Sequence, residues 1–431
     1  MSEVSAPAID ASPDGPAPVP LLAPADGVPP VIDTAAGVVE AARLLAAGTG
    51  PLAVDAERAS GFRYSNRAYL IQLRRAGSGS FLIDPIPVTG DLEPLADVIN
   101  PLEWVLHSAD QDLPGLDELG LRPGALYDTE LAGRLAGFER VGLAAIVERT
   151  LGLELSKGHG AADWSTRPLP DSWLNYAALD VEVLLELREK MVAELADQGK
   201  TDWAAEEFEF IRTAGPPKPK AERWRRTSQI HTLKKARQLA AVRQLWLTRD
   251  DVASRKDVAP GRVLPDSAIV AAANADPKSI DQLRKVAVFG GPRQRRMSRQ
   301  WLDALDEARA LPDSELPPIN QQVVGPPPIN RWARRDPEAA QRLTAARAAM
   351  TALGDEVSIP VENLLLPDLL RRLMWDGIDW KALLPDTDAV ATAIDAYLAA
   401  GNARPWQRTL AVRRLAEAVV NAPAAPEASD A

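Results

Sequence analysis

The stretch Leu52-Ala-Val-Asp-Ala-Glu57 decides how the first half of the chain is interpreted. Its apolar start is short and bounded by turn residues, which predicts a strand over 52–55. Residues two apart on an extended chain project from one face, so Asp55 and Glu57 present two carboxylates side by side. Like charges this close repel each other, and a divalent cation is the usual remedy. An isolated Asp-x-Glu more often lies in an exposed turn without function, so the pair needs support from other residues.

Outward from this stretch, the chain alternates between strand and helix patterns. Short apolar runs predict further strands at 68–73, 81–84 and 104–107. Apolar residues at three- and four-residue spacing predict helices at 37–47, 91–99, 111–119, 128–136, 142–150 and 171–197, the last capped by Asp171-Ser172. The alternation predicts an α/β layer.

Proline-rich segments divide the chain of 431 residues, whose length predicts several domains. We interpret residues 1–33 as a disordered arm, 213–222 and 311–330 as linkers, and 421–431 as a disordered tail. The ordered blocks are then 34–212, 223–310 and 331–420. The second and third blocks show no convincing strand and many Ala, Leu and Arg residues at helical period, which predicts two small all-helical domains.

Composition excludes several kinds of site. Cysteine is absent, which excludes disulfides, thiolate metal sites and cysteine nucleophiles. Only three histidines are present, whereas carboxylates are plentiful, so a metal here would be hard and bound by oxygen. No apolar run approaches the ~20 residues that cross a bilayer, and the start lacks a signal-peptide pattern. We therefore expect a cytoplasmic protein with no membrane association.

Two further motifs add to the first pair of carboxylates. In His107-Ser-Ala-Asp-Gln-Asp112 a strand pattern gives way to a helix pattern, and the spacing does not choose between Asp110 and Asp112. In Tyr176-Ala-Ala-Leu-Asp180 a helix places the phenol and the carboxylate on one face, one turn apart. Alone, each of these acidic residues is as readily a helix cap or a surface group. Together with the first motif they form a candidate site.

The three motifs, Asp55-x-Glu57, His107-x-x-x-x-Asp112 and Tyr176-x-x-x-Asp180, resemble in order the exonuclease motifs of the DEDD superfamily in its tyrosine-bearing branch. The stretches Asn66-Arg-Ala-Tyr-Leu-Ile-Gln-Leu73 and Ala162-Asp-Trp-Ser-Thr-Arg-Pro-Leu-Pro-Asp-Ser-Trp-Leu-Asn-Tyr-Ala-Ala-Leu-Asp180 resemble ribonuclease D. The resemblance covers about 34–212. It selects Asp112 over Asp110, because the second-motif aspartate of the family lies five residues after the histidine.

The resemblance implies a ribonuclease-H-like α/β exonuclease domain, with a mixed sheet flanked by helices, that hydrolyses nucleotides from a 3′ end and releases nucleoside 5′-monophosphates. It also implies two divalent ions, Mg²⁺ or Mn²⁺, which activate a water and stabilise the attacking and leaving oxygens. The implied ligands are Asp55, Glu57, Asp112 and Asp180. Tyr176 would position the water, and His107 is interpreted as a structural residue at a strand end.

The second block resembles a different module. Arg255-Lys-Asp-Val-Ala-Pro-Gly-Arg-Val-Leu-Pro-Asp-Ser267 is similar to the HRDC domain, and we assign residues 223–310 to it. In the third block, Val357-Ser-Ile-Pro-Val-Glu-Asn-Leu-Leu-Leu-Pro-Asp368 has a similar loop followed by a helix pattern. We therefore expect an HRDC-like domain at 331–420, so that the fold is an α/β exonuclease domain followed by two small all-α domains.

Charge is distributed unevenly. The net charge is -11, yet the segment from Lys218 to Ala310 holds 21 basic and 10 acidic residues. A basic cluster with interleaved tryptophans suits binding to a phosphate backbone, although charge runs are usually solvated faces. The candidate nucleic-acid contacts in this segment are Arg225, Arg226, Lys234 and Lys235. Near the first motif they are Arg63, Tyr64 and Arg67, for which a solvated loop is an equal alternative.

The leading hypothesis is a 3′–5′ exoribonuclease that trims stable RNAs, tRNA precursors above all. Its partner would be RNA with a free 3′ end, and no stable protein partner is implied. A DNA exonuclease of repair is one alternative, because the residues themselves do not distinguish RNA from DNA. A catalytically silent RNA-binding scaffold is another, but it would not need the carboxylates and the tyrosine together.

Overall fold

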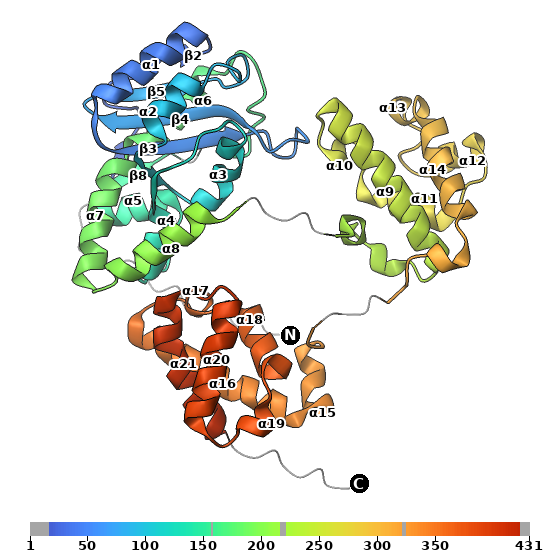
Figure 1. Ribbon diagram of the computed structural model, residues 1–431. Helices are drawn as coiled ribbons and strands as arrows, with labels where there is room; N and C mark the ends of the chain where they lie inside the picture. Colours follow the sequence, from blue (N-terminus) through green and yellow to red (C-terminus); the bar gives the residue numbers. More distant parts are fainter. Residues whose placement is uncertain (1–16, 157, 216–220, 321–324, 423–431) are drawn as a thin grey trace.

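The computed structural model describes residues 17–156, 158–215, 221–320 and 325–422. Figure 1 shows these residues arranged as three bodies, which follow one another along the chain. The predicted disorder of 1–16 and 423–431 falls outside the described residues. Among the residues that are described, no helix is both long enough and apolar enough to cross a membrane.

A six-stranded mixed sheet forms the centre of the first body, with the spatial order β2-β5-β4-β3-β6-β7. Its strands are β2 (Val31–Ile32), β3 (Thr49–Arg58), β4 (Ala68–Ala76), β5 (Gly79–Ile83), β6 (Glu103–Leu106) and β7 (Ala125–Asp128). β4 runs antiparallel to both β3 and β5, and the other neighbours are parallel. The predicted fold class, an α/β domain with a mixed sheet, is confirmed.

Helices cover both faces of this sheet, so the strands are buried along consecutive residues. They are α1 (Ala35–Ala47), α2 (Glu93–Ile99), α3 (Ala109–Asp117), α4 (Thr129–Leu135), α5 (Leu143–Leu151), α6 (Asp171–Glu182), α7 (Leu184–Asp197) and α8 (Thr201–Thr213). On β4, Leu70 packs in a core shared with α6, whereas the next residue, Ile71, packs in the core shared with α1. The two cores lie on opposite faces because side chains alternate along a strand.

The helix predicted over 171–197 is two helices, α6 and α7, which meet at Val183. The prediction of one helix is wrong because the apolar spacing continues through the junction. The predicted cap is also wrong: Pro170 is the cap residue, and no side chain bonds the first turn. α6 contacts β3, β4 and β5, and α7 contacts β3 and β6. The break thus lets consecutive helices cover different strands.

Residues 17–33 correct the predicted disordered arm. β1 (Val19–Leu21) pairs in parallel with β8 (Leu153–Leu155), and β2 pairs in parallel with β5. Prolines lie within β1 and directly before β2, so the sequence pattern did not predict either strand. An edge strand needs partners on only one side, so prolines next to it are tolerated.

The second body is helical throughout its described residues. Its elements are η1 (Arg223–Arg226), η2 (Ile230–Thr232), α9 (Ala236–Lys256), α10 (Pro260–Val263), α11 (Asp266–Ala275), α12 (Ile280–Lys285), α13 (Pro292–Arg295), α14 (Ser298–Ala310) and η3 (Asp313–Glu315). The final turn lies in the segment predicted as a linker. There, Leu311 and Leu316 pack against the core of the second body, and Arg237 donates to the Leu311 carbonyl at 2.5 Å. The linker prediction is wrong for this part because its leucines have a core to cover.

The third body is also helical in the residues described. Its elements are η4 (Ile329–Arg331), α15 (Trp332–Arg335), α16 (Pro337–Val357), α17 (Val361–Leu364), α18 (Pro367–Arg372), η5 (Leu373–Gly377), α19 (Trp380–Leu383), α20 (Thr387–Ala400) and α21 (Pro405–Val420). Its start repeats the second body: α16, α17 and α18 begin 101 residues after α9, α10 and α11. Each long helix ends at a residue with left-handed backbone, Asp257 or Ser358. The two bodies thus share the same arrangement of a long helix, a turn and two shorter helices.

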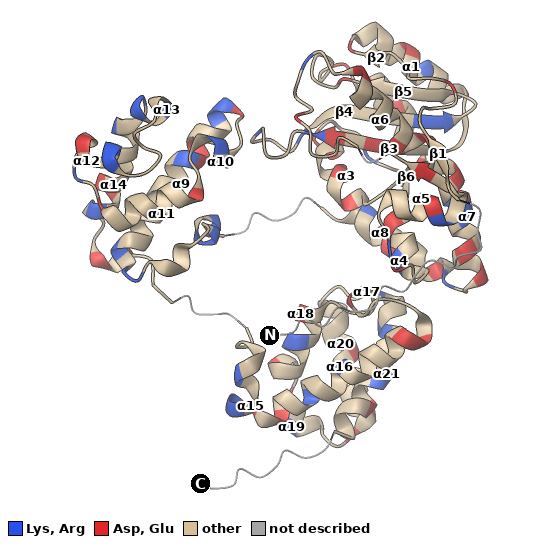
Figure 2. Cartoon of the chain, turned by 180° about the vertical axis from the view of Figure 1, so that it is seen from behind, with Lys and Arg blue, Asp and Glu red and all other residues tan. Residues whose placement is uncertain are grey.

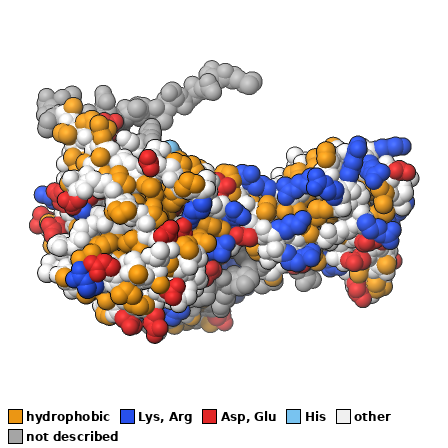
Figure 3. Space-filling view, turned by 90° about the horizontal axis from the view of Figure 1, so that it is seen from above, with side chains coloured by type: hydrophobic (Ala, Val, Ile, Leu, Met, Phe, Trp, Pro, Cys, Tyr) orange, Lys and Arg blue, Asp and Glu red, His pale blue; other side chains and the backbone are white. Residues whose placement is uncertain are grey.

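Charged side chains differ between the bodies. Figure 2 shows Lys and Arg residues along the helices of the second body, among them α10 and α13. In Figure 3 their side chains gather over one face of that body, whereas acidic side chains are more prominent on the rest of the surface in view. The basic segment inferred from the sequence therefore forms a basic surface.

Candidate active site

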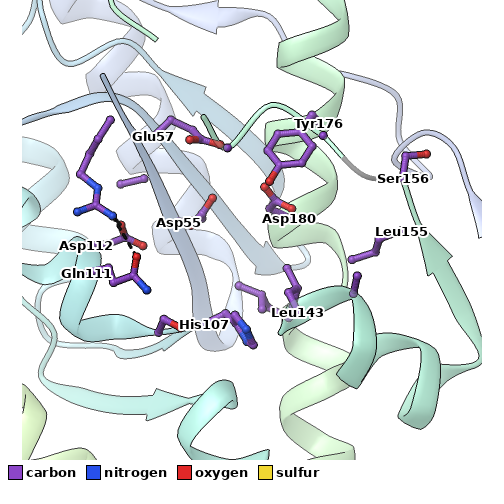
Figure 4. A pocket seen from close by; sticks show the side chains of 17 residues that line it. Asp55, Glu57, His107, Gln111, Asp112, Leu143, Leu155, Ser156, Tyr176 and Asp180 are labelled. Atoms are coloured by element: carbon purple, nitrogen blue, oxygen red, sulfur yellow. Dashed lines mark hydrogen bonds and ion pairs between the residues drawn. The ribbon is translucent and has the colours of Figure 1, made fainter. Parts of the chain in front are cut away.

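A cleft of about 350 Å³ lies between β3, α3, α6 and the residues Leu155, Ser156, Gly158 and Gly160 (Figure 4). All the residues predicted for catalysis line it, namely Asp55, Glu57, Asp112, Tyr176 and Asp180. Three motifs spread over residues 55–180 therefore meet in one place.

The centre of the cleft is a group of three carboxylates. Oxygens of Asp55, Glu57 and Asp180 all lie within 4.8 Å of one another. On β3, Asp55 is paired with Gln72 and Glu57 with Leu70, which places both carboxylates on the sheet face that α6 covers. Asp180 on α6 completes the group from the opposite side (Figure 4). Oxygens at such distances can share a divalent cation.

Asp112 lies beside this group. Its carboxyl group, when protonated, donates a hydrogen bond to Asp55. The start of α3 is fixed by Asp128, which accepts hydrogen bonds from the backbone N–H groups of Ser108 at 3.2 Å and Ala109 at 2.8 Å. Asp110, two residues before Asp112, is exposed and does not line the cleft. The geometry therefore favours Asp112, as the resemblance does.

Burial raises the pKa of all four carboxyl groups above their ordinary values. For Glu57 the pKa rises to about 10, first through burial and then through repulsion by Asp55, Asp180 and Asp112. The hydrogen bond from Tyr176 opposes the rise at Asp180 but does not cancel it. Ionising all four neighbouring carboxyl groups without cations is energetically unfavourable, so the site favours the binding of positive charge.

Tyr176 stands over the carboxylates on the same face of α6 as Asp180 (Figure 4). Its hydroxyl group donates a hydrogen bond to Asp180, four residues along the helix. Burial and the neighbouring negative charges raise the pKa of Tyr176 far above that of a free phenol, so it stays protonated at neutral pH. Gly158 lies against the ring, where an added Cβ would overlap the ring carbons. The neighbouring Lys157 is outside the described residues.

An arginine and a histidine also line the cleft. Arg58 is the only Lys or Arg among the lining residues that the structure describes, and its Nη2 lies 3.6 Å from Asp112 Oδ1. His107 Nδ1 lies 2.9 Å from the Thr129 hydroxyl oxygen. Burial lowers the pKa of His107 to about 4, so the ring is neutral at neutral pH. His107 is thus held by a structural contact, as the sequence analysis proposed.

The Asp-Trp-x-x-Arg-Pro segment before α6 is a structural anchor. Arg167 donates to both carboxylate oxygens of Asp84, at 2.5 and 2.8 Å, and to the Tyr69 carbonyl at 2.7 Å. Trp164 is fully buried beneath the same segment. This bidentate pair ties the entry to α6 to the strands beneath it, and so positions Tyr176 and Asp180.

The predicted nucleic-acid residues Arg63, Tyr64 and Arg67 do not line the cleft. Arg63 donates to the Ser165 hydroxyl at 2.8 Å. Tyr64 and Arg67 instead contact the second body, through Asp250 and Asp257 respectively. Their polar groups therefore join two parts of the chain.

The basic residues predicted in the second body have different surroundings. Arg225 is paired with Glu222 at 2.9 Å and is mostly buried. Arg226, Lys234 and Lys235 are all exposed, and the Lys234 ammonium group donates to the His231 carbonyl. Of the four, the exposed Arg226 and Lys235 have side chains best placed to meet a ligand.

Sequence reasoning missed three residues that shape the cleft: Arg58, Asp128 and Gly158. Arg58 follows the first motif directly. Asp128 comes after a short apolar run and is followed by Thr-Glu, a pattern typical of a helix cap. Both signals were available in the sequence. The role of Gly158 depends on its approach to Tyr176, which no local pattern reveals.

Family models match three segments of the chain. A 3′-5′ exonuclease model matches residues 29–196, and an HRDC model matches residues 238–305. A model for the 3′ to 5′ exonuclease C-terminal domain matches residues 325–419. The predicted order of an exonuclease domain followed by an HRDC domain is thereby confirmed, and the third body matches a family model other than HRDC.

Curated relatives identify the family. Ribonuclease D of Gluconacetobacter diazotrophicus is 31% identical over 283 residues, which are 64% of this chain and 71% of the relative. Ribonuclease D of a Jannaschia species is 32% identical over 283 residues, which are 63% of this chain and 73% of the relative. The chain belongs to the ribonuclease D family. It is an enzyme of the 3′–5′ exoribonuclease class, as the three motifs predicted.

Solved structures extend the likeness to the other bodies. A protein from Bifidobacterium adolescentis is 39% identical with a TM-score of 0.86, over 93% of this chain and 99% of that one. Escherichia coli RNase D has a TM-score of 0.62 at 24% identity, over 86% of this chain and 98% of its own. The first likeness covers all three bodies of this ribonuclease D family member, and the second shows the shared fold.

Proposed function

We propose that this ribonuclease D relative removes nucleotides from the 3′ end of RNA by a two-metal-ion mechanism and releases nucleoside 5′-monophosphates. The observation that carries the proposal is the cluster of three carboxylates from Asp55, Glu57 and Asp180. Asp112 lies in the same cleft and is hydrogen-bonded to Asp55. A phosphodiester needs charge stabilisation at its attacking and leaving oxygens rather than a strong protein nucleophile. A cleft rich in carboxylates and poor in cations of its own suits that chemistry.

The donor set fits hard divalent cations. All four candidate ligands are carboxylates, and their raised pKa values show that the metal-free site disfavours their ionised forms. Oxygen ligands favour Mg²⁺ or Mn²⁺, which keep coordination positions open for water and phosphate. Two such ions, when bound, would supply an activated water and stabilise both oxygens of the displacement. Asp55, Glu57, Asp112 and Asp180 would hold them.

Tyr176 and Arg58 supply two further polar groups of the cleft. Because the Tyr176 hydroxyl stays protonated and donates to Asp180, its oxygen is left to accept a hydrogen bond from the attacking water. Tyr176 thus orients the water without acting as the base. Arg58 lies beside Asp112, where its guanidinium group can contact the phosphate of the 3′-terminal nucleotide.

RNA is the proposed substrate, with tRNA precursors as the proposed physiological class. The curated relatives named ribonuclease D support RNA, and the basic surface of the second body supports a long polyanion. The cytoplasm, where tRNA precursors are processed, is the proposed location. A DNA exonuclease is the alternative, because the same carboxylates could act on a substrate with ribose or with deoxyribose. A silent scaffold is disfavoured by the convergence of all five predicted residues in one cleft.

One assay tests these functions together. A 5′-labelled tRNA with a 3′ extension and a single-stranded DNA of matched sequence are each incubated with the protein in Mg²⁺, in Mn²⁺ and in chelator. We expect stepwise shortening of the RNA that requires a cation. Faster loss of the DNA would overturn the RNA assignment, and no shortening of either substrate would support the scaffold.

Divalent cations should stabilise the protein in a pH-dependent way. A carboxyl group whose folded pKa is raised contributes stability that is fully present below its unfolded pKa, about 4, and is lost as pH rises towards the folded value. For Glu57 that folded value is about 10. The metal-free protein therefore loses stability from pH 5 to pH 8, and bound cation restores it, by about 2.7 kcal/mol at one hundred times the Kd.

Thermal melts at these two pH values, with Mg²⁺ or with chelator, measure the effect. The rise in melting temperature on adding Mg²⁺ should be larger at pH 8 than at pH 5. Asp55→Asn removes one candidate ligand and should reduce the rise. An equal rise in the variant would place the bound cation elsewhere.

Gly158→Ala should slow the reaction by displacing Tyr176. The new Cβ would overlap the tyrosine ring, whereas a Cβ at Gly160 would lie 3.7 Å from the hydroxyl oxygen, an ordinary contact. Misplacing a positioning group by about 1 Å can lower a rate about a hundredfold. We expect kcat to fall by that order for Gly158→Ala, with little change in Gly160→Ala. Single-turnover rates on a short RNA measure both, and equal rates would show that the ring is not confined.

A further inference from the structure

A carboxylate that the catalytic site does not use, Asp257, lies at the centre of the contacts between the first and second bodies. Asp257 ends α9 and faces the loop 61–67, which follows the first carboxylate strand. Its Oδ1 accepts hydrogen bonds from the backbone N–H of Tyr64 at 3.2 Å and from the N–H and hydroxyl of Ser65 at 3.0 and 2.9 Å. Its Oδ2 accepts from Arg67 at 3.2 Å and from the Tyr69 hydroxyl at 3.1 Å. Five donors thus use the full capacity of one carboxylate.

Further contacts surround this carboxylate. The Ala259 N–H donates to the Phe62 carbonyl at 2.9 Å, and Arg262 donates to the Gly61 carbonyl at 2.8 Å. The Arg262 guanidinium group also lies 4.1 Å from the centre of the Phe62 ring. The HRDC-like segment identified from the sequence, Arg255 to Ser267, therefore supplies most of the junction.

The loop held by Asp257 is connected to the catalytic cleft on two sides. It begins shortly after Arg58, which lines the cleft. Tyr69, whose hydroxyl bonds Asp257, offers its carbonyl to Arg167, the anchor of the entry to α6. Asp257 therefore fixes the second body to the same framework that positions the catalytic carboxylates.

The junction also carries a basic cavity. A space of about 520 Å³ is lined by Arg223, Arg226 and Trp246 among others. Arg223 interacts with the Tyr64 hydroxyl, so this cavity borders the loop that Asp257 holds. The Arg223 guanidinium group lies 5.4 Å from the centre of the Trp246 ring. Arginine and an indole together suit a phosphate and a base of single-stranded nucleic acid.

We propose that Asp257 is a positioning residue that holds the second body against loop 61–67, like a latch, and so keeps this cavity at a fixed place beside the cleft. The enzyme would then favour RNAs that are long enough to occupy both the cavity and the cleft. A dinucleotide can occupy only the cleft. A longer RNA gains affinity from the cavity as a second binding site. Because the distance between the cavity and the cleft is fixed, the effective concentration of this second site is raised. This role depends on the proposed ribonuclease activity.

Asp257→Gly removes the latch with little effect on the end of the helix. Asp257 has a left-handed backbone, with φ of 46°, which glycine adopts without strain. Asp276→Gly is a matched control: Asp276 has the same φ of 46° and also ends a helix of the second body. It bonds Lys278 and Arg309 instead of the first body. Both variants remove one negative charge, so their general electrostatic effects on RNA are equal.

The test compares kcat/KM for a dinucleotide and for a single-stranded RNA of about 20 nucleotides, a length chosen to exceed one typical binding site. For Asp257→Gly we expect a fall of about tenfold on the long RNA, mainly through KM, and a change below about twofold on the dinucleotide. Asp276→Gly should match wild type on both. Equal losses on both substrates, or a loss shared by Asp276→Gly, would overturn the role.

Small-angle X-ray scattering of the full chain provides a readout independent of activity. Asp257→Gly should increase the radius of gyration, and Asp276→Gly should not. An unchanged radius would overturn the latch even if the rates differ. If wild type hydrolyses neither RNA, the proposed function fails, whereas the scattering still decides whether Asp257 holds the bodies together. A Ser65→Cys, Asp257→Cys pair, the only thiols in the chain, can then be cross-linked with a short bismaleimide to restore the closed radius.

Discussion

Asp55→Asn should lower the rate of RNA hydrolysis by about 10³-fold or more, the size expected when a group that stabilises transition-state charge is lost. Asp55 contributes an oxygen to the central cluster of carboxylates and accepts the hydrogen bond from Asp112, so its replacement affects both parts of the site. The amide keeps the size of the side chain but cannot supply the negative charge that holds a cation. Single-turnover rates in Mg²⁺ measure the loss.

RNA binding should survive this change. Affinity for a polyanion comes mainly from basic residues, which Asp55→Asn leaves in place, so the Kd should change by no more than about threefold. Asp110→Asn is the matched control because Asp110 lies in the same sequence motif, two residues before Asp112, yet is exposed and outside the cleft. It should keep wild-type activity. Full activity in Asp55→Asn would show that the carboxylate cleft is not the catalytic site.

The sequence predicted the centre of this site well because its signals are local. A period of two on β3 places Asp55 and Glu57 on one face, and a period of 3.6 on α6 places Tyr176 and Asp180 on another. The structure brings both pairs into one cleft. Local periodicity did not distinguish Asp110 from Asp112, since the choice depends on which face of α3 meets β3. That required the family resemblance or the tertiary structure.

The substrate residues were harder to predict for the same physical reason. Arginine and tyrosine after a catalytic motif are typical of nucleic-acid contacts, yet Tyr64 and Arg67 bond acidic residues about 190 positions away in sequence. A side chain's partner across a domain junction leaves no periodic signal. The strand β7 was missed as well, because its last residue, Asp128, also caps α4 and was predicted as the start of a helix.

The third body is joined to the catalytic body by a buried carboxylate that no motif indicated. Glu207 on α8 is 5% exposed, and its Oε1 accepts hydrogen bonds from Arg404 Nε at 2.7 Å and Trp406 Nε1 at 2.9 Å. The Trp406 ring stacks on Trp203, with centres 5.2 Å apart. The junction therefore combines a buried ion pair with aromatic packing from both bodies.

Glu207→Ala should destabilise this junction by about 3–5 kcal/mol, because removing one partner leaves the mostly buried Arg404 charge without its counter-ion and the Trp406 indole N–H without an acceptor. Glu209→Ala is the matched control on the same helix: Glu209 is exposed and pairs with Arg212, and such pairs contribute less than about 1 kcal/mol. Chemical denaturation gives the free energies, and hydrogen exchange locates the effect in α8 and α21.

A second variant separates the ion pair from the packing. Glu207→Leu combined with Arg404→Met replaces both charges by apolar groups, and removing a buried pair together commonly costs less than removing one partner. The double variant should therefore be more stable than Glu207→Ala. If Glu207→Ala and Glu209→Ala lose equal stability, water reaches Arg404 in the folded protein and the junction depends on the stacked tryptophans. Because the third body contacts α8 and the latch acts through loop 61–67, the two junctions should respond to these variants independently.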